Sequence, residues 1–419
     1  MRTLNLLPPV EAMARLSAAL AEAARALGTE IVPTLQAHNR VLAVDVRTPT
    51  DMPEFRRSAV DGFAVKADST PGVLRVIGEV RMGELCLLAV RTGEAVRVPT
   101  GGHVPEGADA VLAQEQARSL SPDVPSEHTP WKIQTSARLT PGENVINQGE
   151  DLRAGDVAIP AGRRLREQEI AGLLALGVTQ VEVRRKPRVA IIASGDELVP
   201  AEAPVRPGQV RNINAPMLSA LVVRNGGEPL NYGILPDTRD AFEQAARRAM
   251  HEADVIVFTA GSSVGERDFV PEVVAHLGKP GVLAHGIYFR PGKPTLFAVC
   301  DGKPLLGLPG NPISTLVTGL MFLAPTLWRV QGADNPPQPN RVKVILTRAI
   351  KSPRDLEHWI PVVLNREHLE HGTQPVEATP TPIKSNLIFG LVRATGLICA
   401  PIGVEMLEAG SVVEARLLE

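Results

Sequence analysis

The 419-residue sequence is poor in cysteine and in aromatic residues, and it has almost no net charge. Its three cysteines, Cys86, Cys300 and Cys399, are too scattered for a disulfide framework or a cysteine-based zinc site, which favours a reducing, cytoplasmic setting. The net charge of −2 excludes a broad basic surface for nucleic acid, so any anionic ligand must be bound by local clusters. We also expect no membrane span and no signal peptide, because no apolar run approaches ~18 residues.

Glycine and proline are abundant instead, with 36 and 37 residues, which predicts many sharp loops around aliphatic cores. The length predicts about two to four domains. Ala and Leu at helical spacing predict a helix over residues 9–27, ended by Gly28. Short β-rich segments then predict a small β module at residues 41–46, 73–80, 95–98 and 110–113.

A proline-rich stretch at residues 119–130 is typical of a mobile surface loop. A second β-rich portion, residues 131–183 with a helix at 166–176, ends in the basic run 184–188. A short basic run before a proline is more typical of a solvated domain boundary than of a nucleic-acid site.

Residues 188–330 alternate between strand and helix patterns. The expected strands are 189–193, 229–234, 254–259 and 305–308, and the expected helices are 215–225, 238–252 (behind Asp237), 269–277 and 312–330. This alternation predicts a parallel sheet covered by helices, with ligands bound at the carboxyl ends of the strands. A proline-rich linker, 334–340, precedes expected strands at 341–345, 359–363, 387–392 and 397–402.

Two of the strand-end loops are rich in small residues. In the loop at 260–268, backbone N–H groups can approach a phosphate, and Asp268 can cap the next helix or bind a metal. In the loop at 309–314, Asn311 is placed to cap a helix that begins with Pro312. Taken alone, the first loop is equally compatible with a tight strand-to-helix turn, and the second is more typical of an ordinary helix start.

Charged residues accompany these loops. Arg290 and Lys293 stand in a Gly- and Pro-rich turn suited to binding phosphate oxygens, or they are solvated surface charges. Asp196 and Glu197 follow the first strand, where carboxylates beside phosphate-binding cations commonly bind Mg²⁺. The simpler interpretation of this pair is a helix cap beside a solvated glutamate.

One motif favours a different class of enzyme. Residues 261–265 match the G-x-S-x-G pattern of serine hydrolases, and Asp355 with His358 follow in the required order. The residues 266–268 delay the helix that should begin directly after the serine, and Asp355 and His358 lie in a separate β domain. The hydrolase stays a minor alternative.

Taken together, several short sequence motifs of this chain resemble one family, the molybdopterin molybdenumtransferases (MoeA-like proteins and the gephyrin E-domain). The resemblance spans nearly the whole chain and rests on residues 53–65, 99–111 with Glu115, 149–151, 194–197, 259–268, 291–294 and 308–314. Each of these motifs alone is weak evidence for the family, but their order and spacing along the chain make the resemblance specific.

The resemblance implies a multidomain fold, α/β plus β. A central three-layer α/β domain, molybdopterin-binding and MogA-like, joins N-terminal β-rich domains and a C-terminal β-barrel-like domain. The implied boundaries are domain I, discontinuous, at residues 1–45 and 140–184; domain II, inserted, at 46–139; domain III at 185–332; and domain IV at 333–419. Two such subunits are expected to form a homodimer.

The implied reaction inserts molybdate into adenylylated molybdopterin with Mg²⁺-dependent release of AMP. By resemblance, the catalytic residues are Asp268, Asp196, Lys293 and Asp61, and the metal ligands are Asp196, Glu197 and Asp268. The expected contacts to the pterin, phosphate or molybdate are Thr100, Ser262, Ser263, Gly265, Arg290, Lys293, Pro309, Asn311 and Ser314. Asp61, Thr100 and Asp151 are expected to reach the site from the partner subunit. Molybdopterin adenylyltransferase and apo-molybdoenzymes or their chaperones are further expected partners.

The sequence departs from the family pattern at several positions. Asn212 stands where the family usually has an aspartate, so one acceptor oxygen remains but the charge is lost. Ala260, Val60, Phe63 and Arg290 replace Gly, Met, Tyr and Lys. These changes leave open a non-catalytic, pterin-binding scaffold. A molybdopterin adenylyltransferase is disfavoured by the long N-terminal β portion, and molybdate is not distinguished from tungstate.

Overall fold

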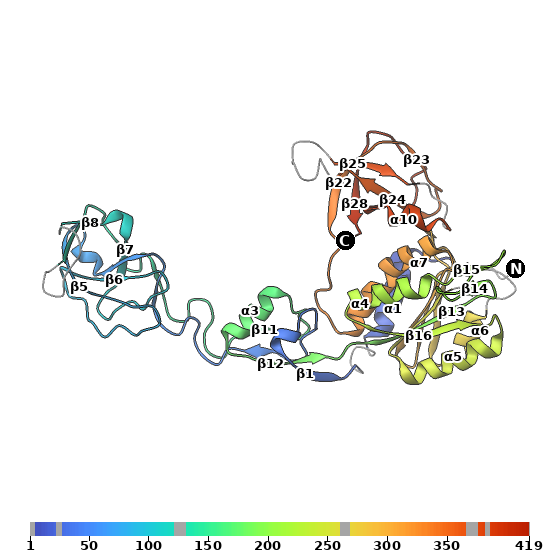
Figure 1. The fold of residues 1–419 in the computed structure, drawn as a ribbon, viewed down its shortest axis with the longest axis horizontal. Helices are drawn as coiled ribbons and strands as arrows, with labels where there is room; N and C mark the ends of the chain where they lie inside the picture. Colours follow the sequence, from blue (N-terminus) through green and yellow to red (C-terminus); the bar gives the residue numbers. More distant parts are fainter. Residues whose placement is uncertain are drawn as a thin grey trace. The chain divides into compact units, whose positions relative to one another are not determined.

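The structure, a computed structural model, describes residues 5–21, 27–120, 131–259, 269–365, 376–381 and 386–418. Its contacts divide the chain into unit 1, Met1–Val44 with Ala161–Glu419, and unit 2, Asp45–Pro160 (Figure 1). The four-domain boundaries expected from the sequence stay a prediction, because this division separates two units only.

A six-stranded mixed sheet, in the order β16-β13-β17-β21-β20-β18, forms the centre of unit 1. Its strands are β13 (Arg188–Ser194), β16 (Glu228–Leu235), β17 (Val255–Thr259), β18 (Pro280–His285), β20 (Leu296–Cys300) and β21 (Lys303–Leu308). The first four strands in that order are parallel, as the sequence predicted. The sequence did not predict the two strands at the other edge, β20 and β18, which are antiparallel. Asp301 and Gly302 both have positive φ there, as a tight hairpin turn requires.

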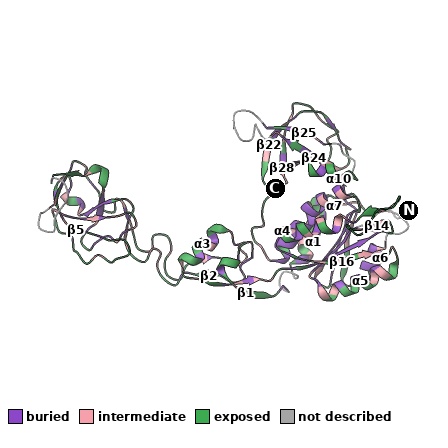
Figure 2. Ribbon diagram, in the orientation of Figure 1, coloured by how far each residue is buried: buried purple, intermediate pink, exposed green. Residues whose placement is uncertain are grey.

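Helices cover both faces of this sheet, which confirms the three-layer α/β domain. One face packs against α1 (Pro9–Leu20), α4 (Asn214–Arg224), α7 (Pro312–Thr318), the π-helical turn Gly319–Leu323 and α8 (Ala324–Val330). The other face packs against α5 (Arg239–Glu252) and α6 (Val270–Val274). The buried residues follow these inner faces (Figure 2). The first helix ends at Leu20 rather than at residue 27, and residues 22–26 lie outside the described part.

The long helix Pro312–Val330 is apolar enough to cross a membrane by length and composition. The sequence analysis considered only unbroken apolar runs, and this helix is interrupted by Ser, Thr, Gly, Pro and Arg residues. In the structure 78% of its apolar window is buried inside the protein, and Val317, Leu323 and Leu327 belong to the sheet's core cluster. A buried core helix explains its composition.

The C-terminal part of unit 1 is a closed barrel. Its strands are β22 (Arg341–Leu346), β24 (Glu357–Leu364), β25 (Val376–Pro380), β26 (Gly396–Ala400) and β28 (Val412–Leu417). Closure arises because β24 pairs with both β25 and β26, and this confirms the barrel expected from the resemblance. The short strands β23 (Ile350–Lys351) and β27 (Met406–Leu407) form a separate pair.

The barrel also corrects one assignment and reveals one unexpected pairing. The strand expected at 387–392 was wrong, because Ile388–Val392 is the short helix α10, with Leu391 buried and Phe389 exposed. A brief apolar run does not distinguish helix from strand. The two-residue strand β19 (Phe289–Arg290), from the α/β domain, pairs with β24 of the barrel.

Residues 27–44 and 161–187 form a smaller part of unit 1. It contains β1 (Thr29–Pro33), the 3₁₀ turn Thr34–Gln36, α3 (Glu167–Ala175) and β12 (Gln180–Arg184). The strands β1 and β12 pair in antiparallel register. The helix expected at 166–176 is thus confirmed, and its Glu169 accepts hydrogen bonds from the Arg166 side chain and backbone at its N-terminus.

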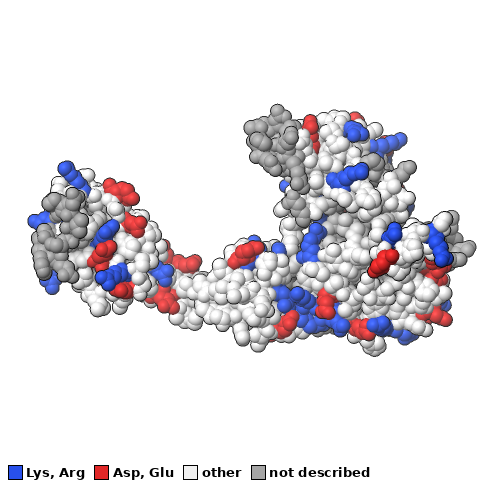
Figure 3. All heavy atoms as spheres, in the orientation of Figure 1, with Lys and Arg blue, Asp and Glu red and all other residues white. Residues whose placement is uncertain are grey.

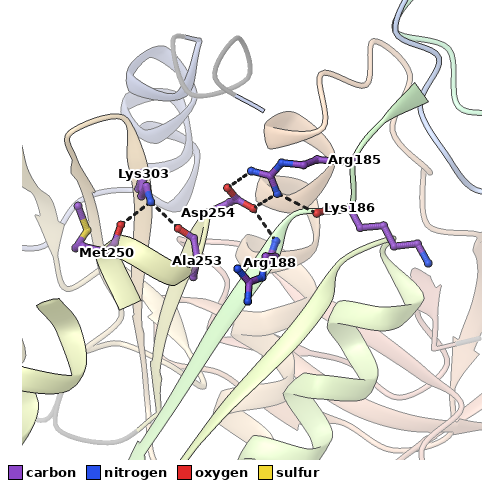
Figure 4. A network of polar contacts seen from close by, with 7 residues as sticks. All are labelled: Arg185, Lys186, Arg188, Met250, Ala253, Asp254 and Lys303. Atoms are coloured by element: carbon purple, nitrogen blue, oxygen red, sulfur yellow. Dashed lines mark hydrogen bonds and ion pairs between the residues drawn. The ribbon is translucent and has the colours of Figure 1, made fainter. Parts of the chain in front are cut away.

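The basic run 184–188 is bonded to the start of the sheet rather than being a loose, solvated boundary (Figure 4). Asp254 accepts two hydrogen bonds from the Arg185 guanidinium, at 2.5 and 2.7 Å, and one from the Arg188 backbone N–H. The Asp254 carboxylate raises the pKa of Arg185. Nearby, Lys303 donates to the carbonyl oxygens of Met250 and Ala253. Acidic and basic side chains are mixed over the visible surface, in keeping with the near-zero net charge (Figure 3).

Unit 2 is built around a six-stranded sheet in the order β7-β4-β6-β5-β9-β8. Its strands are β4 (Gly62–Val65), β5 (Gly72–Glu79), β6 (Glu94–Val98), β7 (Ala110–Ala113), β8 (Arg118–Ser119) and β9 (Trp131–Thr135). The pairs β3 (Arg57–Ser58) with β10 (Val145–Ile146) and β2 (Val46–Arg47) with β11 (Val157–Ile159) complete it. Apart from the strand expected at 41–46, the β segments expected here are confirmed. Most of the loop expected at 119–130 lies outside the described residues.

The central sheet predicts a clear difference between two phenylalanines. Phe297 is fully buried and contacts Phe322 edge to face, with ring centroids 5.1 Å apart, whereas Phe389 is 68% exposed. Phe297→Ala is expected to lower the free energy of unfolding by about 3–5 kcal/mol, because it leaves a cavity. Urea unfolding followed by circular dichroism measures this. Phe389→Ala is the control, expected to change it by less than about 0.5 kcal/mol.

Candidate functional site

The strand register brings the predicted loops to one edge of the central sheet. Ala193 is opposite Thr259 in the parallel pair β13–β17, and Thr259 is opposite Leu308 in β17–β21. In the antiparallel pair β20–β21, Leu296 is opposite Gly307, so the turn before β20 lies at the same edge. The loops that follow β13 and β21 and the turn at 290–295 therefore lie at the same edge of the sheet. They form the candidate site.

Asn214, the first residue of α4, connects these loops. Its side-chain nitrogen donates to Thr259 Oγ1 at 3.1 Å and to the Gly310 carbonyl oxygen at 2.7 Å. The sequence did not single out Asn214 as a site residue, although its place at the start of a helix beside a strand end was a usable signal. The bonds fix the end of β17 against the loop after β21.

Two buried polar atoms at this edge have no hydrogen-bond partner within the described part of the chain. They are Ser194 Oγ, at the end of β13, and Asn214 Oδ1. Because buried polar groups in folded proteins are nearly always paired, each is a position where a ligand or water can bond.

The turn with Arg290 and Lys293 is fixed by close packing. Gly292 has φ of +123°, and a Cβ atom there would lie 2.3 Å from Thr318 Cγ2 of α7. Thr295 donates from its backbone N–H and its hydroxyl to the Gly292 carbonyl oxygen, at 3.1 and 2.7 Å. Within the described residues neither exposed cation, Arg290 nor Lys293, has an ion-pair partner. Their charge is available to an anion.

The predicted carboxylates lie at the opposite side of this edge, after β13. Asp196 and Glu197 are exposed, and Asp196 Oδ1 accepts from the Asp237 backbone N–H at 3.4 Å. The Glu197 carboxylate folds over Gly195, since a Cβ at Gly195 would lie 2.7 Å from Glu197 Oε2. Among the described residues no group of three metal-binding side chains occurs. Two carboxylates still suit Mg²⁺, which is commonly bound through one or two of them plus substrate phosphates.

The loop after β21 positions Pro309, Asn311 and Ser314 at the start of α7. Asn311 is the N-cap residue and Pro312 begins the helix, as predicted, but the Asn311 side chain makes no capping bond. Its carbonyl oxygen accepts from the Thr315 backbone N–H and hydroxyl, at 2.9 and 3.0 Å. The Asn311 side chain is therefore exposed and unused by the helix, whereas Ser314 and Pro309 are buried.

Asn212 has a structural role in the fold. Its side chain is buried, and Oδ1 accepts from the Ala215 backbone N–H at 3.3 Å, in the first turn of α4. The Asn212 backbone N–H donates to the Val199 carbonyl oxygen at 2.8 Å. The acceptor oxygen that remains at this position thus helps to position Asn214.

His358 of the barrel lies opposite Arg290 in the parallel pair β19–β24. It is 1% exposed, and neither ring nitrogen has a hydrogen-bond partner within the described residues. Burial, together with the Arg290 charge, lowers the pKa of His358 to about 4. The barrel therefore contacts the turn that carries Arg290 and Lys293 through a neutral imidazole. The sequence gave no signal for this contact, because His358 and Arg290 belong to regions that it predicts as separate domains.

In unit 2 the structure brings Asp61 and Thr100 together. Asp61 Oδ1 accepts from the Thr100 backbone N–H at 2.7 Å and from its hydroxyl at 3.0 Å. These two bonds, with a smaller contribution from Arg97, lower the pKa of Asp61. Asp151 is exposed in the same unit, and its backbone N–H donates to the Met52 carbonyl oxygen. No contact between Asp151 and the Asp61–Thr100 pair is observed in the described part of unit 2.

Four predicted site residues, Ser262, Ser263, Gly265 and Asp268, lie in the segment 260–268, which is outside the described residues. The third expected metal ligand and the G-x-S-x-G serine therefore stay predictions. The described neighbours of this segment, Thr259 and Phe269, are the end of β17 and the residue before α6.

Known protein families match this chain in three consecutive regions. They are described as the MoeA N-terminal region (domain I and II) at residues 7–177, a probable molybdopterin binding domain at 190–329, and the MoeA C-terminal region (domain IV) at 343–418. These matches, with the α/β domain and its loops, define a protein with a molybdopterin-binding-type domain.

Individual relatives cover most of the chain. A molybdopterin molybdenumtransferase of Nostoc sp. is 33% identical over 91% of this chain and 87% of its own length, and that of Bacillus subtilis is 32% identical over 93% and 90%. The crystal structure of a molybdopterin biosynthesis MoeA protein from Pyrococcus horikoshii OT3 has a TM-score of 0.79 and 30% identity, covering 99% of this chain and 100% of that one. The chain belongs to the molybdopterin molybdenumtransferase family. It is accordingly a transferase of molybdenum cofactor biosynthesis.

The Asp61–Thr100 pair predicts a measurable change in acidity. In Thr100→Val the hydroxyl bond is lost and the backbone bond remains, so the pKa of Asp61 is expected to rise. A carboxyl-carbon NMR titration measures it. Thr29→Val, which removes a hydroxyl bonded to Glu182 in unit 1, should leave Asp61 unchanged. An unaltered Asp61 titration in Thr100→Val would show that the hydroxyl bond has no influence.

The buried His358 predicts a loss of stability in acid. Its pKa falls from 6.5 to about 4 on folding, so below pH 6.5 the unfolded chain binds a proton that the folded chain does not. Stability is therefore lost as the pH falls from about 6.5 to about 4, by about 2 kcal/mol between pH 7 and pH 5. Urea unfolding at both pH values should show this loss reduced by that amount in His358→Gln. The exposed His251→Gln is the control, and equal pH dependence in all three proteins would contradict the role of His358.

Proposed function

We propose that this chain inserts molybdate into adenylylated molybdopterin and releases AMP in a Mg²⁺-dependent reaction. The observation that carries the proposal is the single sheet edge at which Arg290 and Lys293, which have no ion-pair partner among the described residues, lie with Asp196, Glu197 and Asn214. Cations, metal-binding carboxylates and unsatisfied polar atoms in one place suit a substrate with a phosphoanhydride.

The two cations have the clearest part in this chemistry. Arg290 offers a planar fork of donors for two phosphate oxygens, and Lys293 offers a compact charge. Both lie on a turn that Gly292 and Thr295 fix against α7, so little reorganisation is needed when an anion binds. They would stabilise negative charge as the anhydride breaks, and they could also bind a tetrahedral oxyanion.

Asp196 and Glu197 would hold Mg²⁺, with Asp268 as the further expected ligand. When bound, the ion would neutralise negative charge on the phosphate oxygens. Asn214, Asn311 and Ser314 would orient the substrate by hydrogen bonds, and Asn311 is suited to this because its side chain is not used by α7. Ser262, Ser263, Gly265 and Pro309 are proposed as further contacts from the neighbouring loops.

A homodimer is part of the proposal, with Asp61, Thr100 and Asp151 supplied by the partner subunit, as the family resemblance implies. The hydrogen bonds from Thr100 keep Asp61 ionised and oriented. We further propose a cytoplasmic location, exchange with molybdopterin adenylyltransferase, and delivery to apo-molybdoenzymes or their chaperones. Neither nucleic acid nor a membrane is a proposed partner.

The test is direct. Purified protein supplied with adenylylated molybdopterin, Mg²⁺ and molybdate should release AMP and activate an apo-molybdoenzyme. Lys293→Ala is expected to reduce AMP release by about 10²–10³-fold, because it removes a charge at the breaking anhydride. Lys351→Ala, an exposed lysine of the barrel, is the control and should retain activity. Full turnover in Lys293→Ala would exclude Lys293 from the reaction.

A pterin-binding scaffold without turnover is the second candidate, and it is favoured by Asn212. Asn212→Asp should fold normally, because an aspartate oxygen can accept the same bond from the Ala215 N–H. If the wild-type chain binds adenylylated molybdopterin tightly without releasing AMP, and Asn212→Asp restores release, the scaffold is correct. Turnover by the wild-type chain would contradict it.

A further inference from the structure

A cavity of about 380 Å³ lies in unit 1, far from the candidate site. The helices α4 and α7–α8 both begin at the candidate site, with Asn214 and Pro312, and both end at this cavity. Its lining comes from the ends of these helices, the proline-rich linker, β28, and Arg164, which lies shortly before α3: Arg164, Arg224, Asn225, Leu320, Met321, Ala324, Pro325, Trp328, Pro336–Asn340, Arg416 and Leu417. We call it the arginine cavity.

Three arginines from separate parts of the chain converge on it, and none of the described aspartates or glutamates lines it. Arg416 donates to Met321 Sδ at 2.9 Å and to the Leu320 carbonyl oxygen at 3.3 Å. Arg164 donates to Asn39 Oδ1 and lies over the Trp328 ring, 5.4 Å from its centroid. None of the three forms an ion pair with a described residue.

This lack of partners contrasts with nearby arginines. Arg341, directly opposite Arg416 in the β22–β28 pair, is bonded to Glu414 at 2.7 Å. In a neighbouring cavity of about 270 Å³, Arg163 and Arg166 both pair with Glu169. Among the residues that the structure describes, positive charge is therefore uncompensated in the arginine cavity specifically.

The unfavourable environment of this positive charge lowers the pKa of Arg416. Burial, with the charges of Arg224 and Arg341, lowers its pKa to about 10. Arg416 remains protonated at neutral pH, and a bound anion would offset both the desolvation and the repulsion.

The remaining walls are apolar. Leu320, Met321 and Ala324 come from the helices, and Pro336 and Pro337 from the linker. Proline restricts the linker, so the cavity is largely preformed. Its volume lies within the ~300–1,000 Å³ range of small-molecule sites and exceeds what a bare phosphate needs.

We propose that the arginine cavity binds a small organic phosphate of about the size of a nucleoside monophosphate. The phosphate lies between Arg224 and Arg416, whose guanidinium groups can each bond two of its oxygens. The organic part packs against Met321, Ala324 and the linker prolines. This site is separate from the candidate site and does not depend on its proposed function.

The probe is AMP, titrated calorimetrically into the full chain carrying Lys293→Ala, which weakens phosphate binding at the candidate site. In this background Arg224→Gln is expected to reduce the affinity for AMP about tenfold or more, because it removes one guanidinium from the phosphate. Arg224 is exposed, so the variant is expected to keep its fold. Arg416→Gln should do the same and Arg416→Lys should restore part of the affinity. Arg341→Gln, the matched control, should leave it within about twofold.

Two further ligands distinguish the parts of the proposal. Adenosine should fail to bind, since the phosphate is required, and inorganic phosphate should bind more weakly than AMP. Equal affinity for AMP in the Arg224→Gln, Arg416→Gln and parent proteins would overturn the proposal, as would undetectable binding to the parent. If inorganic phosphate bound as tightly as AMP, the proposed packing of the ligand's organic part against the apolar wall would be wrong.

Discussion

The parallel register of β13, β17 and β21 is the constraint on which the rest of the molecule depends. Because Ala193, Thr259 and Leu308 lie in a row, the loops that follow Ala193 and Leu308 lie at one edge, although these two residues are more than a hundred residues apart in sequence. Asn214 fixes this arrangement by bonding to the end of β17 and to the loop after β21. The charged turn at 290–295 then lies beside them because β20 returns along β21.

The sequence predicted most of this architecture where the local pattern was strong. Alternating strands and helices after residue 188, and the Asn-Pro start of α7, were all correct, because each depends on neighbouring residues only. The antiparallel strands β18 and β20 were missed, although the Asp301-Gly302 pair is a typical hairpin turn. The short helix α10 was taken for a strand because five apolar residues have no clear period.

The site was predictable as a set of loops but less so as a set of contacts. Motif order pointed to Arg290, Lys293, Asp196 and Asn311, and the structure places all four at the same edge. The partners that position them could not be predicted, because they depend on tertiary packing. Thr318 behind Gly292, the bonds from Asn214 to Thr259 and Gly310, and His358 beside Arg290 all join residues that are well separated in the chain.

The position of α1 has a consequence for how the chain folds during synthesis. Ala12, Leu16 and Leu20 belong to the same core as Phe297 and Leu306, so α1 ends long before the strands it covers have been made. The apolar face of α1 cannot be buried against the sheet until the ribosome has synthesised β21. Contacts so distant in sequence close slowly, and the waiting helix exposes apolar surface that promotes aggregation.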